Sequence, residues 1–293
     1  MADDSLKAAV MAKECYVLVD SFNHLFSDYD TTSELSRLNA KAGKSPQKIS
    51  PALFDIILRS QKAYQQSKHA FDITIGPLSK FWRKARKDKK FPEAFTVAIK
   101  RKLVGFSQLQ IDMLHQTVKL PVAGMRLDLG GIAKGYIAQK VVDLLYTKGI
   151  TQALADAGGD MAMSNAPDKT NGWIIGINVP ETTDELLPRK LLLQNISVAT
   201  SGDAYQYFEN NGIKYSHIID PRTGYGISSQ RNVTIIASSG TDADWLATAC
   251  SILSIEESKK LAVKMKAELL ITEMKNEKVV YYMTSGFKQF WKP

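Results

Sequence analysis

The chain has 293 residues, of which 44% are hydrophobic and 23% charged, the proportions of an ordinary globular protein. This composition excludes wholesale disorder and collagen-like repeats, and the length suffices for a substantial hydrophobic core. The 38 Lys and Arg exceed the 30 Asp and Glu, so the formal charge is +8, which favours anionic partners without choosing among nucleotides, phosphates, anionic membranes and nucleic acid.

The two cysteines, Cys15 and Cys250, lie far apart without Cys-x-x-Cys spacing, which argues against a disulfide scaffold or a zinc site. Cys250 lies in an apolar run, 246–253, and is expected to be a buried thiol. No stretch approaches the roughly 20 apolar residues that cross a bilayer. The first ten residues carry Asp3 and Asp4 where a signal peptide would be positively charged.

The first part of the chain is predicted to be mainly helical. Apolar residues recur with a helical period over 6–26, and Ser50-Pro51 joins a capping residue to proline at a first helical position. The expected helices are 6–26, 34–39 and 51–68. The basic segment 80–102 is interpreted as a solvated helix face and loop, although its interleaved aromatic residues would also suit nucleic acid.

From about residue 109 the pattern changes to short strands separated by helices. Asn210-Asn211-Gly212 is a tight-turn signal that joins two of these strands. The expected strands are 109–114, 117–120, 126–129, 153–156, 172–179, 191–199, 204–209, 214–219, 232–237, 269–272 and 279–283, and the expected helices are 134–148, 242–253 and 256–266. The class is therefore α+β, with mixed sheets and flanking helices, and without a clean linker 1–293 is expected to form a single unit.

Leu127-Asp-Leu-Gly-Gly-Ile-Ala-Lys-Gly-Tyr136 combines the end of a strand, two glycines and the start of a helix. Gly130 and Gly131 let backbone groups approach a ligand closely, and a helix N-terminus beside Lys134 favours phosphate. The spacing fits neither a dinucleotide-binding fingerprint nor a P-loop. A purely structural strand-to-helix turn is an equal alternative.

Two further motifs are weaker by themselves. Asp156-Ala-Gly-Gly-Asp160 is typical of a simple turn, with Asp160 a candidate to orient a ligand. Thr200-Ser-Gly-Asp203 leads through the hairpin to His217-Ile-Ile-Asp-Pro-Arg-Thr-Gly224. A lone histidine is usually structural, but the polar neighbours of His217 leave a functional role equally open.

Asp244 and Thr248 are four residues apart on a predicted helix and therefore share one face. A carboxylate beside a hydroxyl suits a hard, oxygen-ligated cation such as Mg²⁺. The alternative is that Asp242 caps the helix and Thr248 packs internally.

Taken in order, these motifs resemble the ApbE family, the FAD:protein FMN transferases. The matching blocks span roughly 20–250 and are Tyr29 with Ser33-Glu-Leu-Ser-Arg-Leu-Asn39, Ala70-Phe-Asp72 before Gly76-Pro77-Leu78, Asp128-Leu-Gly-Gly-Ile-Ala-Lys-Gly135, Gly158-Gly-Asp160, Thr200-Ser-Gly-Asp203, His217 to Gly224, and Asp244 with Thr248. Family members usually begin with a strand whose Met-Gly-Thr-like turn helps to cover the flavin. This chain begins at the helix that normally follows, so either a truncated start or a shorter variant is expected.

The resemblance implies Mg²⁺-dependent transfer of FMN from FAD to a Thr or Ser hydroxyl of an acceptor protein through a phosphoester bond, with release of AMP. It gives the Gly131 carbonyl and the Asp244 and Thr248 side chains as Mg²⁺ ligands. It makes His217 the base that takes the acceptor proton, with Asp160 and Ser201 as weaker candidates for the same site. The residues that match FAD contacts are Tyr29, Ala70, Phe71, Asp72, Asp128, Lys134 and Ile218.

The same resemblance suggests as acceptor a subunit of a sodium- or proton-linked redox complex or a flavinylated reductase domain, with no nucleic acid as partner. It places the protein at the periplasmic side of the inner membrane, with a cytoplasmic location as the alternative. Two other functions stay open: a Mg²⁺-dependent FAD diphosphatase giving FMN and AMP, and a non-catalytic flavin-binding protein. The joint presence of His217, Asp244 and Thr248 argues against the second.

Overall fold

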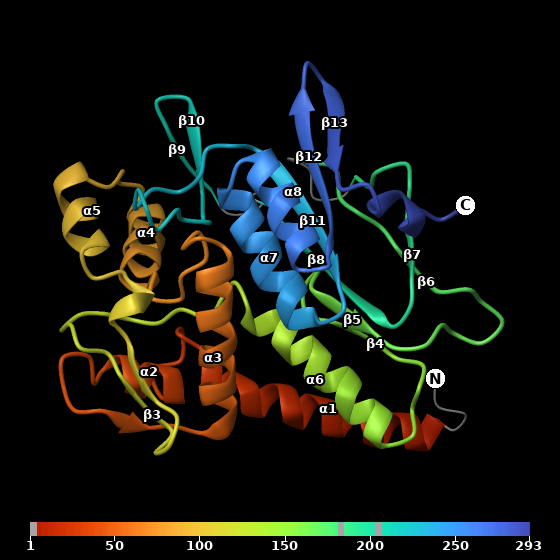
Figure 1. Cartoon of the computed structure of the whole chain (residues 1–293), viewed down its shortest axis with the longest axis horizontal. Coiled ribbons are helices and arrows are strands. Elements are labelled where there is room, and N and C mark those ends of the chain that lie inside the picture. The colour runs from red at the N-terminus through yellow and green to blue at the C-terminus, as the bar shows by residue number, and fades with distance from the viewer. Residues whose placement is uncertain (1–4, 181–184, 203–206) are drawn as a thin grey trace. The chain divides into compact units, whose positions relative to one another are not determined.

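The computed structural model describes residues 5–180, 185–202 and 207–293 (Figure 1). These residues form two compact units. The first comprises Met1–Phe22, Ile132–Ala204 and Gln230–Pro293, and the second comprises Asn23–Gly131 and Tyr205–Ser229. That the two act as a single functional unit over 1–293 stays a prediction.

The first unit is built on a six-stranded antiparallel sheet in the order β13-β12-β11-β8-β5-β4. Its strands are β4 (Leu154–Asp156), β5 (Met161–Met163), β8 (Ile196–Ser201), β11 (Arg231–Ala237), β12 (Glu268–Lys275) and β13 (Lys278–Met283). All seven residues of β11 are buried, so both faces of the sheet are covered at its centre.

Helices and a second strand pair supply this cover. Helices α6 (Ala133–Thr147) and α7 (Gly240–Ile252) pack on each other and on the sheet (Figure 1). The pair β6 (Trp173–Ile175) and β7 (Leu191–Leu193) joins an apolar cluster with residues of β8, β11 and β12. The remaining elements of the unit are α8 (Ile255–Lys264), the short 3-10 helix η2 (Phe287–Phe290) and the residues of α1 (Ser5–Phe26) up to Phe22.

Two glycines allow α6 and α7 to touch through their backbones. A Cβ atom placed on Gly135 would overlap the carbonyl oxygen of Gly240 and lie 2.7 Å from the Cβ of Asp244. A Cβ atom on Gly240 would in turn overlap the carbonyl oxygen of Gly135. This contact holds the first turns of the two helices together, and Asp244 therefore lies beside the N-terminus of α6.

The second unit combines helices with two small antiparallel sheets. Its elements are α2 (Glu34–Asn39), α3 (Pro51–Gln66), α4 (Gly76–Asp88), α5 (Ala94–Arg101), the 3-10 helix η1 (Phe106–Gln108), the sheet β1-β3-β2 (Gln47–Lys48, Thr117–Lys119, Gln110–Asp112) and the hairpin β9-β10 (Tyr207–Asn210, Ile213–Ser216). The side chain of Ser50 caps α3, as the Ser-Pro pair predicts. Asn211 and Gly212 at the hairpin turn both have positive φ, as a tight two-residue turn requires.

The α+β class and most of the expected elements are confirmed. Every described strand ladder is antiparallel, however, because hairpins join neighbours such as β4 and β5, so the expected mixing of strand directions within a sheet is wrong. The expected strand 126–129 is also wrong, because only Arg126 makes a single bridge, to Ile75. The stretch 191–199 is two strands, divided where Asn195 adopts a positive φ. The start of the strand expected over 204–209 lies outside the described residues.

Cys15 and Cys250 are both free thiols, and burial raises the pKa of Cys250 to about 12. Of the helices that the structure describes, none combines the length and apolarity needed to span a bilayer.

Replacing Gly135 by Ala should destabilise the protein. In an ordinary helix this change stabilises by about 1 kcal/mol. Here the new methyl group meets a backbone carbonyl, and we expect the free energy of unfolding to fall by about 1–3 kcal/mol, measured by urea denaturation. Gly149→Asn is the control, because Gly149 follows the same helix with φ of +82° and nothing within 4 Å. Gly135→Ala protein as stable as the wild type would contradict the contact.

Candidate functional site

In the first unit, three ionisable side chains meet at the N-terminus of α6. The Lys134 Nζ atom lies 2.5 Å from Oδ2 of Asp160, and the backbone N–H of Gly135 donates to Oδ2 of Asp244 at 2.9 Å. Asp160 reaches this position from the turn between β4 and β5, where Gly158 and Gly159 both have positive φ. The turn interpretation of this motif is therefore correct, and the turn also delivers a buried carboxylate to the cluster.

The electrostatics of this cluster follow from its burial. Burial and the neighbouring carboxylate of Asp160 raise the pKa of Asp244 well above its usual value, despite Lys134 and two backbone N–H groups. Burial likewise raises the pKa of Asp160, only partly offset by Lys134. Burial lowers the pKa of Lys134, but the two carboxylates outweigh it and the net shift is upward. The pKa values of Lys134 and Asp160 both rise, although the two groups form an ion pair. The burial effect dominates for Asp160, which is almost wholly buried, whereas the Lys134 side chain is half exposed and the attraction of the carboxylates dominates there.

Two carboxyl groups thus share one ammonium group, so the cluster has more acidic than basic side chains. Thr248 lies one helical turn beyond Asp244 on α7 and is half-buried. Among the described residues, the Thr248 hydroxyl makes no hydrogen bond to a side chain or to a carbonyl group. Asp242 does not cap the helix: Ser239 occupies the N-cap position, and Asp242 accepts a hydrogen bond from the Trp245 indole at 2.9 Å.

In the second unit, Asp128 is the centre of a polar network. Its carboxylate accepts hydrogen bonds from Ser79 Oγ at 2.5 Å, from Arg83 Nη2 at 2.9 Å and from the N–H of Gly130 at 2.9 Å. The same Arg83 nitrogen pairs with Asp28. The Arg83 guanidinium carbon also lies 4.5 Å from the centre of the Tyr29 ring.

Arg83 therefore stands between two carboxylates and beneath an exposed aromatic ring. Burial, followed by the charge of Asp128, raises the pKa of Asp28, and Arg83 opposes this rise. Burial lowers the pKa of Arg83, but Asp28 and Asp128 outweigh it. Tyr29 and Asp128, both expected to contact FAD, are thus linked through a residue that sequence analysis placed in a solvated basic run.

The Ala70-Phe71-Asp72 block is almost wholly buried, so a ligand would meet it mainly through backbone atoms. Asp72 accepts hydrogen bonds from the N–H and hydroxyl of Thr74, at 2.8 and 2.6 Å, and from the N–H of Phe106 at 3.0 Å. Burial is the main cause of its raised pKa, and these bonds oppose it. Asp72 thus shapes the turn that precedes α4.

This turn lies directly beside the Asp128 segment, because the N–H of Asp128 donates to the carbonyl of Ile73 at 2.7 Å. The Ile218 side chain is also buried. The next residue, Ile219, packs against Leu78 and Trp82 of α4, which places the loop after β10 in the same unit.

His217 is exposed and follows directly after the last residue of β10, Ser216. The polar residues that follow His217, which suggested a site, bind one another within the turn. Asp220 makes a two-pronged ion pair with Arg222, with Arg222 Nη2 at 2.7 Å, and its carbonyl accepts the N–H of Gly224 at 2.8 Å. The Asp220 carboxylate is therefore engaged in the turn.

The structure thus brings Lys134, Asp160 and Asp244 together in one unit, and Tyr29 and Asp128 together in the other. The assignments of Gly131, Thr248, His217, Ser201 and the FAD contacts stay predictions. Sequence analysis missed Asp28, Ser79 and Arg83. The only signals for these residues were the position of Asp28 next to Tyr29 and a helical spacing of four between Ser79 and Arg83.

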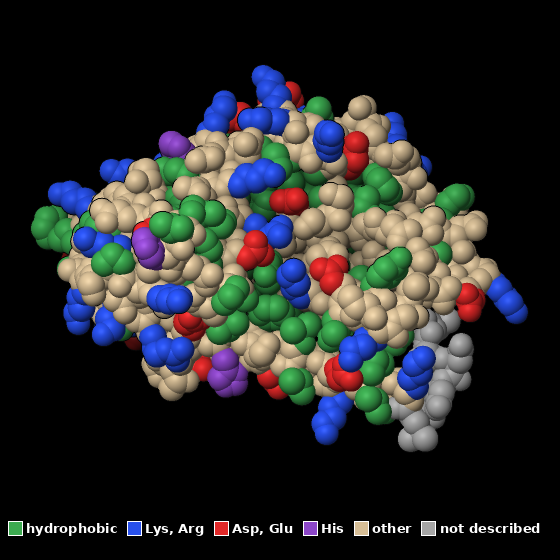
Figure 2. All heavy atoms as spheres, turned by 60° about the horizontal axis from the view of Figure 1, so that its bottom comes forward, with side chains coloured by type: hydrophobic (Ala, Val, Ile, Leu, Met, Phe, Trp, Pro, Cys, Tyr) green, Lys and Arg blue, Asp and Glu red, His purple; other side chains and the backbone are tan. Residues whose placement is uncertain are grey.

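No group of three or more His, Cys, Asp or Glu side chains among residues 5–180, 185–202 and 207–293 could hold a metal ion. A cation at Asp244 would therefore need hydroxyl and backbone oxygens as additional ligands. On the face drawn in Figure 2, the Lys and Arg side chains are scattered among Asp and Glu side chains.

Comparison with known proteins gives the class of protein to which this fold and these sites belong. The chain matches the model of the ApbE family over residues 3–271 and belongs to that family. It is 34% identical to an FAD:protein FMN transferase of Treponema pallidum, over 84% of this chain and 72% of the relative, and 31% identical to one of Klebsiella pneumoniae, over 84% and 77%.

Solved structures agree. A flavin transferase ApbE variant from Vibrio cholerae superimposes with a TM-score of 0.86 at 28% identity, covering 98% of this chain and 91% of that one. The ApbE protein of Thermotoga maritima gives a TM-score of 0.89 at 26% identity, covering 100% and 94%.

Removing the positive charge of Arg83, which lies between Asp28 and Asp128, should destabilise the protein in a pH-dependent way. We expect Arg83→Met to lower the free energy of unfolding by about 1–3 kcal/mol near neutral pH, because two part-buried carboxylates then face each other. Without Arg83 the already raised pKa of Asp28 rises further, so the native state binds a proton more readily than the unfolded chain. The loss should therefore shrink as the pH falls from about 7.5 to about 5.

Urea denaturation at the two pH values measures this effect. Arg86→Met is the matched control, because Arg86 lies on the same helix and makes no ion pair among the described residues. Arg83→Met/Asp28→Asn should recover most of the lost stability. An equal loss in Arg86→Met, or a loss that grows at acid pH, would contradict the bridging role.

Proposed function

We propose that this chain transfers FMN from FAD to a Thr or Ser hydroxyl of an acceptor protein through a phosphoester bond and releases AMP. Family membership supports the proposal, together with one observation. The ammonium group of Lys134 and the N-terminus of α6 lie beside two buried carboxyl groups, those of Asp160 and Asp244. Such a place can hold an anionic diphosphate and a cation next to each other, which phosphoryl transfer requires.

Mg²⁺ is the cation that fits the residues present. Its proposed ligands are the backbone carbonyl of Gly131 and the side chains of Asp244 and Thr248, which are the hard oxygen donors that Mg²⁺ prefers. The excess of carboxyl over ammonium groups in the cluster supports a cation there. When bound, Mg²⁺ would orient the diphosphate and offset negative charge on the departing AMP.

The remaining side chains have separate roles in FAD binding and proton transfer. Lys134 holds the diphosphate through its ammonium group, and Tyr29 and Asp128 contact FAD from the Arg83 network. Ala70, Phe71, Asp72 and Ile218 complete the proposed FAD contacts. The acceptor oxygen forms a bond to the FMN phosphorus while the bridging P–O bond to AMP breaks. His217 accepts the proton of the acceptor hydroxyl, for which an imidazole is suited near neutral pH.

The acceptor and the location are proposed from the family alone. The acceptor is a redox-complex subunit or a reductase domain, and the protein works at the periplasmic side of the inner membrane rather than in the cytoplasm. Fractionation of cells that produce the natural protein would test the location, and recovery in the cytoplasmic fraction alone would contradict it.

Incubation with FAD, Mg²⁺ and a candidate acceptor distinguishes the possible functions by mass spectrometry. A transferase adds the mass of FMN to the acceptor and produces AMP. Free FMN and AMP without modified acceptor would instead indicate an FAD diphosphatase. Unchanged FAD would indicate a flavin-binding protein.

Asp244→Asn should abolish Mg²⁺-dependent turnover of FAD while the fold is kept. The change removes the only charged side chain among the proposed ligands, and we expect a rate loss of about 10²-fold or more. Because burial disfavours the charged carboxylate, the variant should be at least as stable as the wild type in EDTA. Asp242→Asn, on the same helix, is the control and should keep its activity. Turnover by folded Asp244→Asn at low Mg²⁺ would refute the metal assignment.

His217→Gln should bind FAD normally but transfer FMN about 10²–10⁴-fold more slowly, the usual contribution of a general base. The loss should shrink as pH rises, because the acceptor hydroxyl then needs less assistance. Transfer rate, FAD affinity and thermal melting are compared with His115→Gln, which changes an exposed histidine of the β2–β3 hairpin. If His217 is only structural, its variant will lose stability and FAD affinity with an unchanged pH profile.

A further inference from the structure

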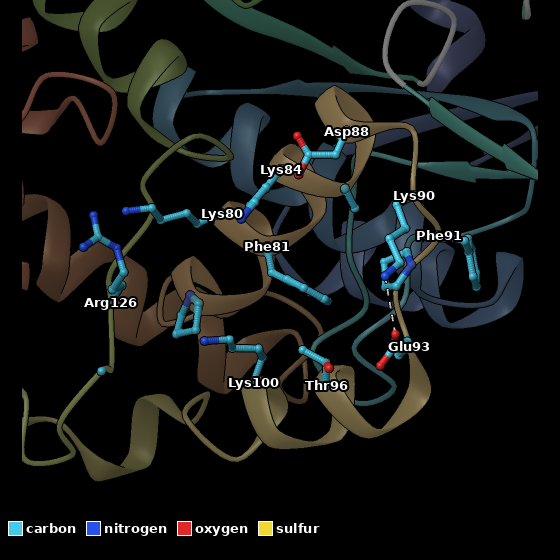
Figure 3. A pocket seen from close by; sticks show the side chains of 14 residues that line it. Lys80, Phe81, Lys84, Asp88, Lys90, Phe91, Glu93, Thr96, Lys100 and Arg126 are labelled. Carbon is cyan, nitrogen blue, oxygen red and sulfur yellow. Dashed lines mark ion pairs between the residues drawn. The ribbon is translucent and has the colours of Figure 1, made fainter.

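A groove of ≈ 720 Å³ opens in the second unit beside α4 and α5 (Figure 3). Lys80, Lys84 and Asp88 line it from α4, and Thr96 and Lys100 line it from α5. The helical period places these α4 residues on a different side of the helix from Ser79 and Arg83, which bind Asp128. None of the proposed FAD contacts lines this groove.

The groove is strongly positive. Its lining carries five cations, Lys80, Lys84, Lys90, Lys100 and Arg126, and two carboxylates, Asp88 and Glu93. Glu93 pairs with Lys90 at 3.6 Å (Figure 3). Over the part of the chain that the structure describes, the other four cations make no ion pair. An anionic partner would therefore meet charges that are not already neutralised.

Two aromatic side chains of the lining give the groove an apolar part. Phe81 and Phe91 line the groove and pack against the core around Trp82. The Phe91 and Trp82 rings meet edge to face, with their centres 5.7 Å apart.

We propose that this groove docks an acidic segment of the acceptor protein, with Asp or Glu against the four unpaired cations and apolar side chains against Phe81 and Phe91. The inference rests on the proposed function, since it assigns the surface to the acceptor. An extended acidic peptide fits a groove lined by both apolar and positively charged side chains. A flat lipid surface does not enter a concave site, and the aromatic rings here are packed into the core rather than free to stack on bases.

The test measures the binding of a fluorescein-labelled peptide that alternates Glu with Leu and Phe. Fluorescence anisotropy compares the wild type with Lys84→Glu/Lys100→Glu, which reverses two groove charges. Lys87→Glu/Lys102→Glu is the matched control, because it makes the same charge change on exposed lysines of the same helix and at the end of the other, outside the groove. A peptide with Gln in place of Glu shows whether the carboxylates matter.

We expect the groove variant to bind the peptide about tenfold or more weakly, since two attractions become repulsions, and the control to bind within about twofold of the wild type. FAD affinity and thermal melting should be unchanged in both variants. Equal losses in both variants, or equal binding of the Gln peptide, would overturn the docking site. The docking site would also be overturned if the wild type bound phosphatidylglycerol vesicles but not the peptide, and the groove variant lost the vesicle binding. Groove-dependent peptide binding by a protein that transfers no FMN to the hydroxyl-bearing candidate acceptor would count against the proposed function and leave an acidic docking site standing.

Discussion

The close approach of Gly135 and Gly240 is the constraint on which the candidate site depends. Because neither residue has a side chain, the first turns of α6 and α7 meet through their backbones, and the Asp244 carboxylate accepts the N–H of Gly135. A buried carboxylate and the positive end of a helix dipole thus lie side by side. Asp160 and Lys134 complete the arrangement from either side. The protein therefore holds charges of both signs in one small volume, which suits a diphosphate carried with a cation.

Arg83 has the corresponding role in the second unit. It pairs with Asp28 and Asp128 and lies against Tyr29, so one guanidinium group fixes three side chains from two segments of the chain. The Asp128 segment is also tied to the Asp72 turn through the carbonyl of Ile73. Charged residues on α4 thus have two different functions: Arg83 is engaged in the network, whereas Lys80 and Lys84 on another side of the helix line an open groove.

Local patterns predicted the fold well where a short-range rule decides the structure. Ser50-Pro51 marks a helix start, and Asn211-Gly212 forms the hairpin turn. The expected strand 126–129 failed because an apolar alternation shows nothing about pairing partners, and only Arg126 found one. The site was predicted in part. Motif order indicated Asp128, Lys134 and Asp244, but the pairing of Arg83 with Asp28 depends on residues 55 positions apart, which no local pattern contains. The basic run 80–102 likewise predicts a uniformly solvated surface, and only the tertiary contacts distinguish Arg83 from the other basic residues.

The central claim is that the cluster of Lys134, Asp160 and Asp244 binds the diphosphate of FAD together with Mg²⁺. Isothermal titration calorimetry of the wild-type protein with FAD, AMP and riboflavin, each with Mg²⁺ and with EDTA, tests it most directly. We expect FAD to bind at least about tenfold more tightly with Mg²⁺ than with EDTA, AMP to compete with it, and riboflavin, which has no phosphate, to bind far more weakly. Riboflavin binding as tightly as FAD, with no effect of Mg²⁺ on either, would contradict it.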